Sequence, residues 1–258
     1  MDIDVESLER ATLDAVAPQH TVALPGWLVP IDPSTIGRAT SAVPLAHTGT
    51  YTLHAQAMQV ADIEACYAER QLPPRFRVAD VAGLAGLHLA LDRAGYAAQQ
   101  PTLTLVGQTT AVLDHALANR PANMPQVVVS ASPNDAWQAV YLAAGFDPTD
   151  GAHRIAALSR STTVVYASIS GPNGPLAAGT ASFSRGWASV HGMRTVPQAR
   201  GQGLARHIIS SLARLACSRG LERVFLQVEE SNAGALSLYQ HLGFKVAWRY
   251  HYWRKPGA

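Results

Sequence analysis

The sequence predicts a mixed α/β fold, also describable as α+β, in which each β-sheet is mixed and flanked by helices. Apolar residues recur at helical spacing in some segments and alternate or run together in others, and the two kinds of segment are interspersed along the 258 residues. One strand–helix–strand unit, 187–228, also requires a parallel strand pair joined by a crossover helix.

Each element of the first half has a local reason. An apolar stripe predicts a helix at 4–17, and a proline-containing turn between two extended runs predicts a hairpin over 26–45. Asp62 is a candidate cap near the start of a second helix, and two prolines stop that helix. The remaining expected elements are a helix at 58–74, a strand at 75–78, a helix at 81–96 ended by Gly95, and a strand at 102–107.

The segment NRPANMP (119–125) is the best linker candidate, because it holds two prolines and has no periodicity. We therefore divide the chain into domains at 1–124 and 125–258. In the second part the pattern predicts strands at 126–132, 187–197, 222–230 and 245–255, a hairpin around GPNG (171–174), and helices at 133–145, 201–220 and 231–244. Asn134 is a plausible cap of the first of these helices.

Composition limits the function classes. Hydrophobic residues make up 48% and charged residues 15%, which is typical of a well-cored globular protein. A net charge of +2 gives no basic field, so we predict no nucleic-acid partner. Cys66 and Cys217 are far apart, which argues against a disulfide framework, and no metal site is predicted. No signal peptide and no apolar run of roughly 18 residues is found, so we expect a cytoplasmic protein without a membrane partner.

The stretch TVPQARGQGLARHIISSLARLA (195–216) begins a helix without a capping side chain. An NTPase phosphate loop would need Lys-Ser or Lys-Thr after the last glycine, but Leu204 and Ala205 follow here. A dinucleotide fingerprint would need a third glycine where Arg206 stands. Neither reading fits the loop.

The first turn of a helix carries unpaired N–H groups and a partial positive charge, which together favour a phosphate. A pyrophosphate can accept these N–H groups directly, and glycines keep Cβ atoms out of its way. The alternative is a tight strand–helix turn in which Gly201 and Gly203 serve only the backbone angles.

The segment Arg200–Ala205 fits the pattern Arg/Gln-x-x-Gly-x-Gly/Ala of the GNAT superfamily of N-acetyltransferases. After the next strand, Asn232 to Tyr239 resembles the family's Asn-x-x-Ala-x-x-x-Tyr, followed by Gly243-Phe244. The resemblance covers roughly 126–258 and implies that 125–258 is a catalytic GNAT domain with acetyl-CoA as cosubstrate.

By this resemblance, the strand ending at 193–196 offers backbone groups to the pantetheine arm and polarises the acetyl carbonyl. The glycine loop binds the pyrophosphate, Asn232 bonds to pantetheine or orients the neighbouring turn, and Tyr239 protonates the leaving sulfur. The implied cosubstrate-binding residues are Met193, Thr195, Val196, Arg200, Gly201, Gln202, Gly203, Leu204, Ala205 and Asn232. A tyrosine at this spacing is otherwise read as a core residue of an amphipathic helix.

The general base is where the resemblance weakens. Some relatives place a glutamate early on the strand before the loop, where this chain has Trp187 and Ser189. Others carry a glutamate in Leu-Glu-Val on the next strand, where this chain has Gln227. His191 and Glu229 are the candidates that remain, and a chain of water molecules is the alternative to a single base.

The first half resembles a degenerate copy of the same domain, because ALDRAGY (90–96) parallels LYQHLGF (238–244) with Leu91 in place of the tyrosine. The alternative is an unrelated α/β domain. Resemblance to bacterial two-domain GNAT proteins implies a tandem arrangement in which the first domain shapes the acceptor side. The candidate contacts there are Trp27, Arg38 and Ser41. The run WRYHYW (248–253) lines the acceptor pocket or forms a strand with one packed face.

Together these readings predict an acetyl-CoA-dependent N-acetyltransferase that moves an acetyl group to a primary amine by direct attack on the thioester. The competing hypothesis from another class is a non-catalytic acyl-CoA-binding sensor or scaffold. The sequence does not identify the acceptor, a small molecule or a peptide, and it leaves a homodimer open.

Overall fold

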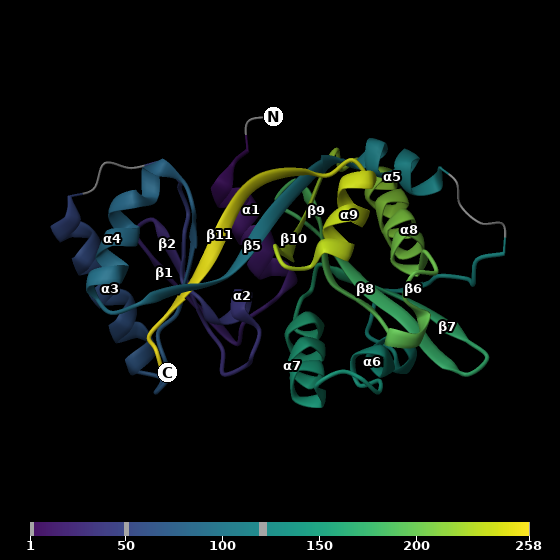
Figure 1. Ribbon diagram of the computed structural model, residues 1–258, viewed down its shortest axis with the longest axis horizontal. Coiled ribbons are helices and arrows are strands. Elements are labelled where there is room, and N and C mark those ends of the chain that lie inside the picture. Colours follow the sequence, from purple (N-terminus) through teal and green to yellow (C-terminus); the bar gives the residue numbers. More distant parts are fainter. Residues whose placement is uncertain (1–2, 49–51, 119–122, 258) are drawn as a thin grey trace.

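The computed structural model describes residues 3–48, 52–118 and 123–257. Within these residues an eight-stranded sheet runs across both halves of the chain in the order β4-β11-β5-β10-β9-β8-β7-β6 (Figure 1). Its strands are β4 (Phe76–Ala79), β5 (Ala97–Gln108), β6 (Val128–Ser130), β7 (Val164–Gly171), β8 (Gly174–Ser184), β9 (Trp187–Thr195), β10 (Arg223–Glu229) and β11 (Lys245–Arg254). The predicted mixed α/β class is confirmed.

A smaller sheet packs beside it, formed by β1 (His20–Leu24), β2 (Trp27–Ile31) and β3 (Val43–Pro44). The predicted hairpin over 26–45 is confirmed in its pairing, because β2 and β3 are antiparallel neighbours joined by a connection that contains Pro33. A second hairpin, between β1 and β2, was not predicted. Gly26, with φ of +77°, makes the tight turn between β1 and β2, and Pro30 lies inside β2. The short helix α2 (Gly37–Thr40) then connects β2 to β3 and carries Arg38.

The two halves of the chain share strands. Strand β5, from the first half, lies between β10 and β11 and is antiparallel to both. Strand β11, from the end of the chain, lies in turn between β5 and β4. The division at residue 124 stays a prediction, but this interleaving means that the first half supplies a strand to the interior of the sheet that holds the second half.

The parallel unit expected at 187–228 is confirmed, since β9 and β10 pair in parallel around helix α8 (Leu204–Ser218). Trp187 of β9 donates its indole N–H to Ser7 of helix α1 (Val5–Ala15) at 2.9 Å. Its neighbours Ala188 and Val190 instead pack with the apolar face of α8. Because successive strand residues face opposite sides, α1 and α8 cover opposite faces of the sheet.

The other helices are α3 (Leu53–Ala68), a 3₁₀ turn (Ala82–Leu84) continued by α4 (Ala85–Arg93), α5 (Thr109–Leu117), α6 (Asp135–Tyr141), α7 (Pro148–Ser159) and α9 (Ala233–His241). Helix α3 begins five residues earlier than predicted, because the Thr52 hydroxyl accepts a bond from the Ala55 N–H and Asp62 lies inside the helix. Helices α5 and α7 were not predicted, although Asp147 caps α7 and Pro148 follows it as a recognisable start signal. Part of the expected linker, 119–122, lies outside the described residues.

Asn134 caps α6 as predicted, accepting a 2.9 Å bond from the Trp137 N–H. Trp137 is fully buried in the larger of two extensive apolar clusters. Apolar residues of α8 belong to the same cluster. The other extensive cluster lies around β4 and β11 and includes Trp187 and Phe225. None of the described helices is both long enough and apolar enough to span a bilayer.

Candidate active site

The parallel strands β9 and β10 separate at the centre of the sheet. Their pairing ends at Val190 and Leu226, yet β9 continues to Thr195 and β10 to Glu229. Beyond Val190, one edge of β9 therefore has no strand beside it, and those of its backbone groups that no side chain engages are available to another molecule.

A β-bulge redirects β9 at the same point. Gly192 and Met193 together lie opposite Gly179 of β8, and Gly192 has a φ of +61° that favours glycine. The Tyr141 hydroxyl donates a 2.5 Å bond to the Gly192 carbonyl and so fixes the bulge. The Met193 side chain packs on Gly179, so the part of Met193 that can serve a ligand is its backbone.

Helix α8 begins without a side-chain cap, as the sequence predicts. Its N-cap residue Gly203 has a φ of +75°, and Gly201 has a φ of +76°. These angles alone favour glycine, and a Cβ at either position meets no protein atom within 4 Å. The first bond of the helix runs from the His207 N–H to the Gly203 carbonyl, and the N–H groups of residues 204–206 have no hydrogen-bond partner among the described residues.

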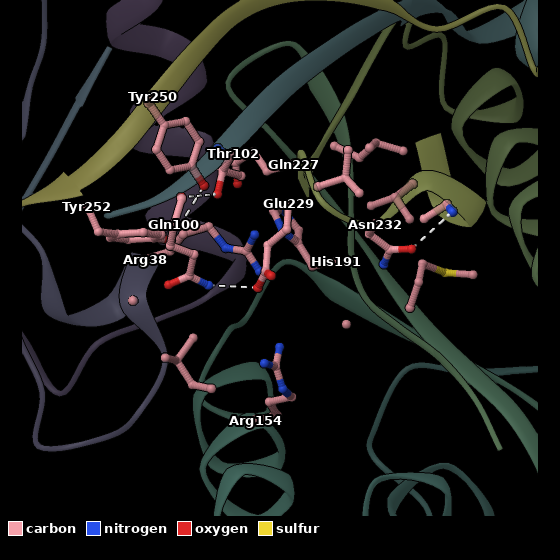
Figure 2. Close-up of a pocket in the computed structure, with 18 of the residues that line it drawn as sticks. Arg38, Gln100, Thr102, Arg154, His191, Gln227, Glu229, Asn232, Tyr250 and Tyr252 are labelled. Atoms are coloured by element: carbon pink, nitrogen blue, oxygen red, sulfur yellow. Dashed lines mark hydrogen bonds between the residues drawn. The ribbon is translucent and has the colours of Figure 1, made fainter. Parts of the chain in front are cut away.

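A cavity of about 250 Å³ opens where β9 and β10 separate (Figure 2). Elements of both halves form its walls: the α2 region, β5, α7, β9, β10, α9 and β11. The lining residues that carry polar or ionisable side chains are Thr35, Arg38, Gln100, Thr102, Arg154, His191, Gln227, Glu229, Asn232, Tyr239, Tyr250, Tyr252 and Arg254.

Tyr239 reaches the cavity from α9 and is only 7% exposed. Burial raises the pKa of its phenol to about 12, although the charge of Arg38 acts in the opposite direction. The hydroxyl has no hydrogen-bond partner among the described residues. Tyr239 therefore presents a protonated, unengaged O–H group at neutral pH.

Glu229, at the end of β10, carries the one carboxylate among the described residues that line the cavity. The Gln100 amide of β5 donates a 2.7 Å bond to it (Figure 2). Gln100 has a φ of +52°, a strained conformation for a residue other than glycine, at a bulge between β5 and β11. The strained backbone thus directs the Gln100 amide to Glu229.

His191 also lines the cavity but is 3% exposed, and its ring packs edge-on against Phe225. Burial first, and then the charges of Arg38 and Arg77, lower its pKa well below 6.5. The imidazole is therefore neutral at physiological pH, and its affinity for a proton is weak.

The lowered pKa of His191 predicts a pH dependence of stability. Below pH 6.5 the unfolded chain binds a proton that folded His191 does not, so the free energy of unfolding falls with falling pH. His191→Gln should remove up to about 1.4 kcal/mol per pH unit of this decline below pH 6.5. Urea unfolding between pH 7 and 5 measures it, with exposed His20→Gln as the control; equal slopes in both variants would contradict the assignment.

Asn232 acts first on its own helix. Its side-chain oxygen accepts a 3.1 Å bond from the Ala235 N–H and caps α9 (Figure 2). The oxygen thus orients the turn that carries Tyr239, one of the two roles that the resemblance implied. The amide N–H₂ of the same side chain lies at the cavity and is available to donate.

The structure brings five of the predicted residues together at the cavity: Met193, His191, Glu229, Asn232 and Tyr239. The others form the turn from β9 into α8, outside the cavity lining, and the side chain of Leu204 is buried in the core. Arg200 and Gln202 are exposed and bond weakly to nearby carbonyls.

Of the three residues predicted to contact the acceptor, one lies at the cavity and two do not. Arg38 lines the cavity, whereas Trp27 packs edge-on against Phe76 in the core, and Ser41 is fully buried away from the cavity. The run 248–253 does both things expected of it, because Tyr250 and Tyr252 are buried in the core and also reach the cavity.

Several cavity residues had no signal of their own in the sequence: Gln100, Thr102, Arg154 and Arg254. Arg154 lies on the unpredicted helix α7, and Gln100 lies on a part of β5 that was not predicted. A proline next to Gln100, inside an otherwise strand-like stretch, was the available hint of a bulge.

GNAT proteins are among the solved structures that superpose on this chain. A GCN5-related N-acetyltransferase from Kribbella flavida superposes with a TM-score of 0.73 at 16% identity, covering 100% of this chain and 98% of that one. A tandem GNAT protein from the clavulanic acid biosynthesis pathway superposes with a TM-score of 0.62 at 13% identity, over 98% and 95% of the two chains. At these identities the similarity shows the fold.

Curated relatives match over shorter segments. The uncharacterized N-acetyltransferase YobR of Bacillus subtilis is 36% identical over 76 residues, 30% of this chain and 31% of that protein. A mycothiol acetyltransferase of Salinispora arenicola is 48% identical over 56 residues, 21% of this chain and 18% of that protein. The chain thus matches about a third or less of the length of each.

The fold of this chain is therefore that of the GNAT proteins. Residues 3–253 match the family described as "Probable histone acetyltransferase Rv0428c C-terminal", and the chain belongs to that family.

Proposed function

We propose that this protein transfers the acetyl group of acetyl-CoA to a primary amine by direct attack on the thioester. The observation that carries the proposal is the meeting of three features at one cavity: the unpaired edge of β9, the free Tyr239 hydroxyl and the Glu229 carboxylate. Each supplies one of the needs of the reaction, which are a bound carbonyl, an acid and a base.

The residues present fit the cosubstrate. The pyrophosphate would lie against the N–H groups that open α8, where no side chain caps the helix and no protein atom occupies the space before the two glycines. The pantetheine arm would bond to the free edge of β9 between His191 and Thr195 and to the Asn232 amide.

In the proposed reaction, groups of this chain stabilise the charge that develops and supply and accept the protons. The amine nitrogen forms a bond to the acetyl carbon as the carbon–sulfur bond breaks. Backbone N–H groups of the β9 bulge stabilise the negative charge on the carbonyl oxygen. The Tyr239 hydroxyl gives its proton to the leaving sulfur, and the proton lost by the amine passes to the base.

We propose Glu229 as that base in preference to His191. The Glu229 carboxylate faces the cavity and is oriented by Gln100. His191 is buried against Phe225 among positive charges that oppose its protonation. A neutral imidazole of such low pKa accepts a proton poorly in the transition state.

Release of the CoA thiol, followed with a thiol reagent over a panel of amines, tests the proposal. Steady release that depends on an amine, together with the acetylated amine in mass spectra, is expected. Tight binding of acetyl-CoA without release for any amine would leave only the sensor hypothesis, and no binding would overturn both.

The glycine at the start of α8 gives a specific prediction. Gly203→Ala and Gly220→Ala each place a Cβ on a left-handed residue, at opposite ends of the same helix and with open space around it. Both should lose a similar free energy of unfolding, about 1–2 kcal/mol. Only Gly203→Ala should weaken CoA binding, by about 10-fold or more in calorimetry, because its Cβ enters the pyrophosphate site. Equal CoA affinity in the two variants would contradict a phosphate site there.

We also propose that residues 1–124 are a degenerate copy of the catalytic domain that serves the acceptor side. The order β3-α3-β4-α4-β5 parallels β9-α8-β10-α9-β11. At the position of the uncapped α8, helix α3 is capped by its own Thr52. Where Tyr239 stands in α9, the first half has the fully buried Leu91. These features support a copy that binds no coenzyme.

A further inference from the structure

Positive charge dominates the cavity. Among the described residues that line it, Arg38, Arg154 and Arg254 carry guanidinium groups, against the single carboxylate of Glu229. Glu229 is engaged by Gln100 and forms no ion pair with Arg38. The cavity therefore holds more cations than its own walls neutralise.

Arg38 is the central cation. It extends from α2 into the cavity, and its guanidinium lies among Gln100, Glu229 and His191 (Figure 2). Its Nε atom is buried without a hydrogen-bond partner, and the side chain forms no ion pair with any described residue. A partly buried guanidinium without a counter-charge is costly, which favours an anion as its partner when the site is in use.

Arg254, at the end of β11, repeats the pattern. Its guanidinium lies 5.5 Å from the centre of the Tyr252 ring and forms no ion pair with the residues that the structure describes. Arg75 behind it adds a like charge: burial and the charge of Arg254 lower the pKa of Arg75. Arg154 differs, because Asp150 neutralises it at 2.7 Å.

We infer that the amine acceptor of this site is a small amino carboxylic acid, whose carboxylate binds Arg38 with support from Arg254. The inference rests on the proposed acetyl transfer and specifies its substrate class. Carboxylates form strong, charge-assisted bonds with the planar donors of arginine, so this ligand neutralises guanidinium groups that have no ion pair among the described residues.

Size and charge favour this class over a basic peptide. A cavity of about 250 Å³ lies just below the usual range for ligand pockets, about 300–1,000 Å³, so it suits a small acceptor beside the thioester end. A lysine-rich peptide would bring further positive charge next to Arg38 and Arg254. Like charges in a partly desolvated site repel each other.

The test compares amino acids with their carboxamides, which keep the amine and remove the negative charge. The amine of the amide is less basic and so more reactive at a given pH, and a preference for the acid therefore runs against intrinsic reactivity. We expect kcat/KM to favour the acid by about 10- to 100-fold. A lysine-rich peptide without free carboxylates is the third substrate.

Arg38→Gln should reduce the acid-to-amide ratio to about 3-fold or less, and Arg254→Gln should reduce it partly. The KM for acetyl-CoA should stay unchanged in both. The ratio is insensitive to general damage, which lowers both rates alike. Arg70 is an exposed arginine in the turn after α3, so Arg70→Gln removes the same charge outside the cavity and should keep the wild-type ratio.

Calorimetry of the acids and amides with the CoA-saturated protein separates the two proposals. Acid binding that Arg38→Gln abolishes, without turnover of any amine, would uphold a carboxylate site at Arg38 but overturn the transferase and, with it, the assignment of the acid as acceptor. Turnover that prefers the amides or the lysine-rich peptide, or that ignores the carboxylate, would overturn the inference and uphold the transferase. Absence of acid binding and of acid turnover would likewise overturn it.

Discussion

Tyr239→Phe is expected to lower kcat by about 10²- to 10⁴-fold, the range for loss of a positioned general acid, with little change in the affinity for acetyl-CoA. The pKa of about 12 keeps the phenol protonated at working pH, and its hydroxyl has no protein partner among the described residues that would be lost with it. Because nothing else in the fold depends on that O–H, the variant should retain its thermal unfolding midpoint. Stopped-flow or steady-state release of CoA measures the rate.

A matched control removes a hydroxyl elsewhere. Tyr96 is 2% exposed, lies outside the cavity and donates a 2.8 Å bond to Glu64, so Tyr96→Phe should reduce stability but spare kcat. A kcat of Tyr239→Phe within about 3-fold of the wild type would contradict the proposal that Tyr239 is the general acid, since the thiolate would then leave without a proton from this side chain.

The raised pKa of Tyr239 also sets the sign of its pH effect. Above pH 10 the unfolded chain ionises this phenol while the folded protein keeps it protonated, so the phenol makes stability fall as pH rises past 10. Tyr239→Phe should therefore be less sensitive to alkaline unfolding than the wild type. At neutral pH the two proteins should unfold alike.

The half of the proposed site around the glycine loop could be predicted from local chemistry. An absent cap before Leu204 and paired glycines follow from helix-end electrostatics and backbone angles, which depend on a few adjacent residues. The structure confirms the uncapped helix and the parallel β9–α8–β10 unit. The left-handed backbone angles of Gly201 and Gly203 are by themselves enough to explain why glycine stands at both positions. The support for a bound phosphate is therefore that a Cβ at either position would meet no protein atom within 4 Å.

The acceptor half could not be derived in the same way, because it is made by distant parts of the chain. Gln100 reaches Glu229 only because β5 is inserted between β10 and β11, and no local pattern encodes that order. Arg154 depends on α7, which was not predicted although its cap signal, Asp147 before Pro148, was readable. Arg38 was named by resemblance, but its lack of an acidic partner is visible only in three dimensions.

Beneath the cavity, the fold depends on a buried ion pair. Arg77 of β4 and Glu9 of α1 are 1% and 2% exposed in their side chains and meet at 2.5 Å. Burial alone would lower the pKa of Arg77, but the charge of Glu9 and their hydrogen bond raise it. The guanidinium also lies 5.2 Å from the ring of Tyr250, which lines the cavity. The pair thus joins α1 to the cavity wall.

Arg77→Met should therefore destabilise the protein by about 3–5 kcal/mol, because it leaves the Glu9 carboxylate buried without a counter-charge. Urea unfolding measures the change, and thermal melting should show a midpoint lower by roughly 10 °C. Glu9→Met should cost a similar amount, since Arg77 then becomes the uncompensated ion.

The double variant Glu9→Met/Arg77→Met decides the cause. If the penalty comes from an unpaired charge, removing both charges should restore most of the lost stability, with a coupling energy of at least about 2 kcal/mol between the two sites. Two strictly additive losses would instead assign the effect to packing of the long side chains against Tyr250 and α1. In that case acetyl transfer should fall together with stability, because the wall of the cavity would have shifted, whereas a rescued double variant should keep its kcat.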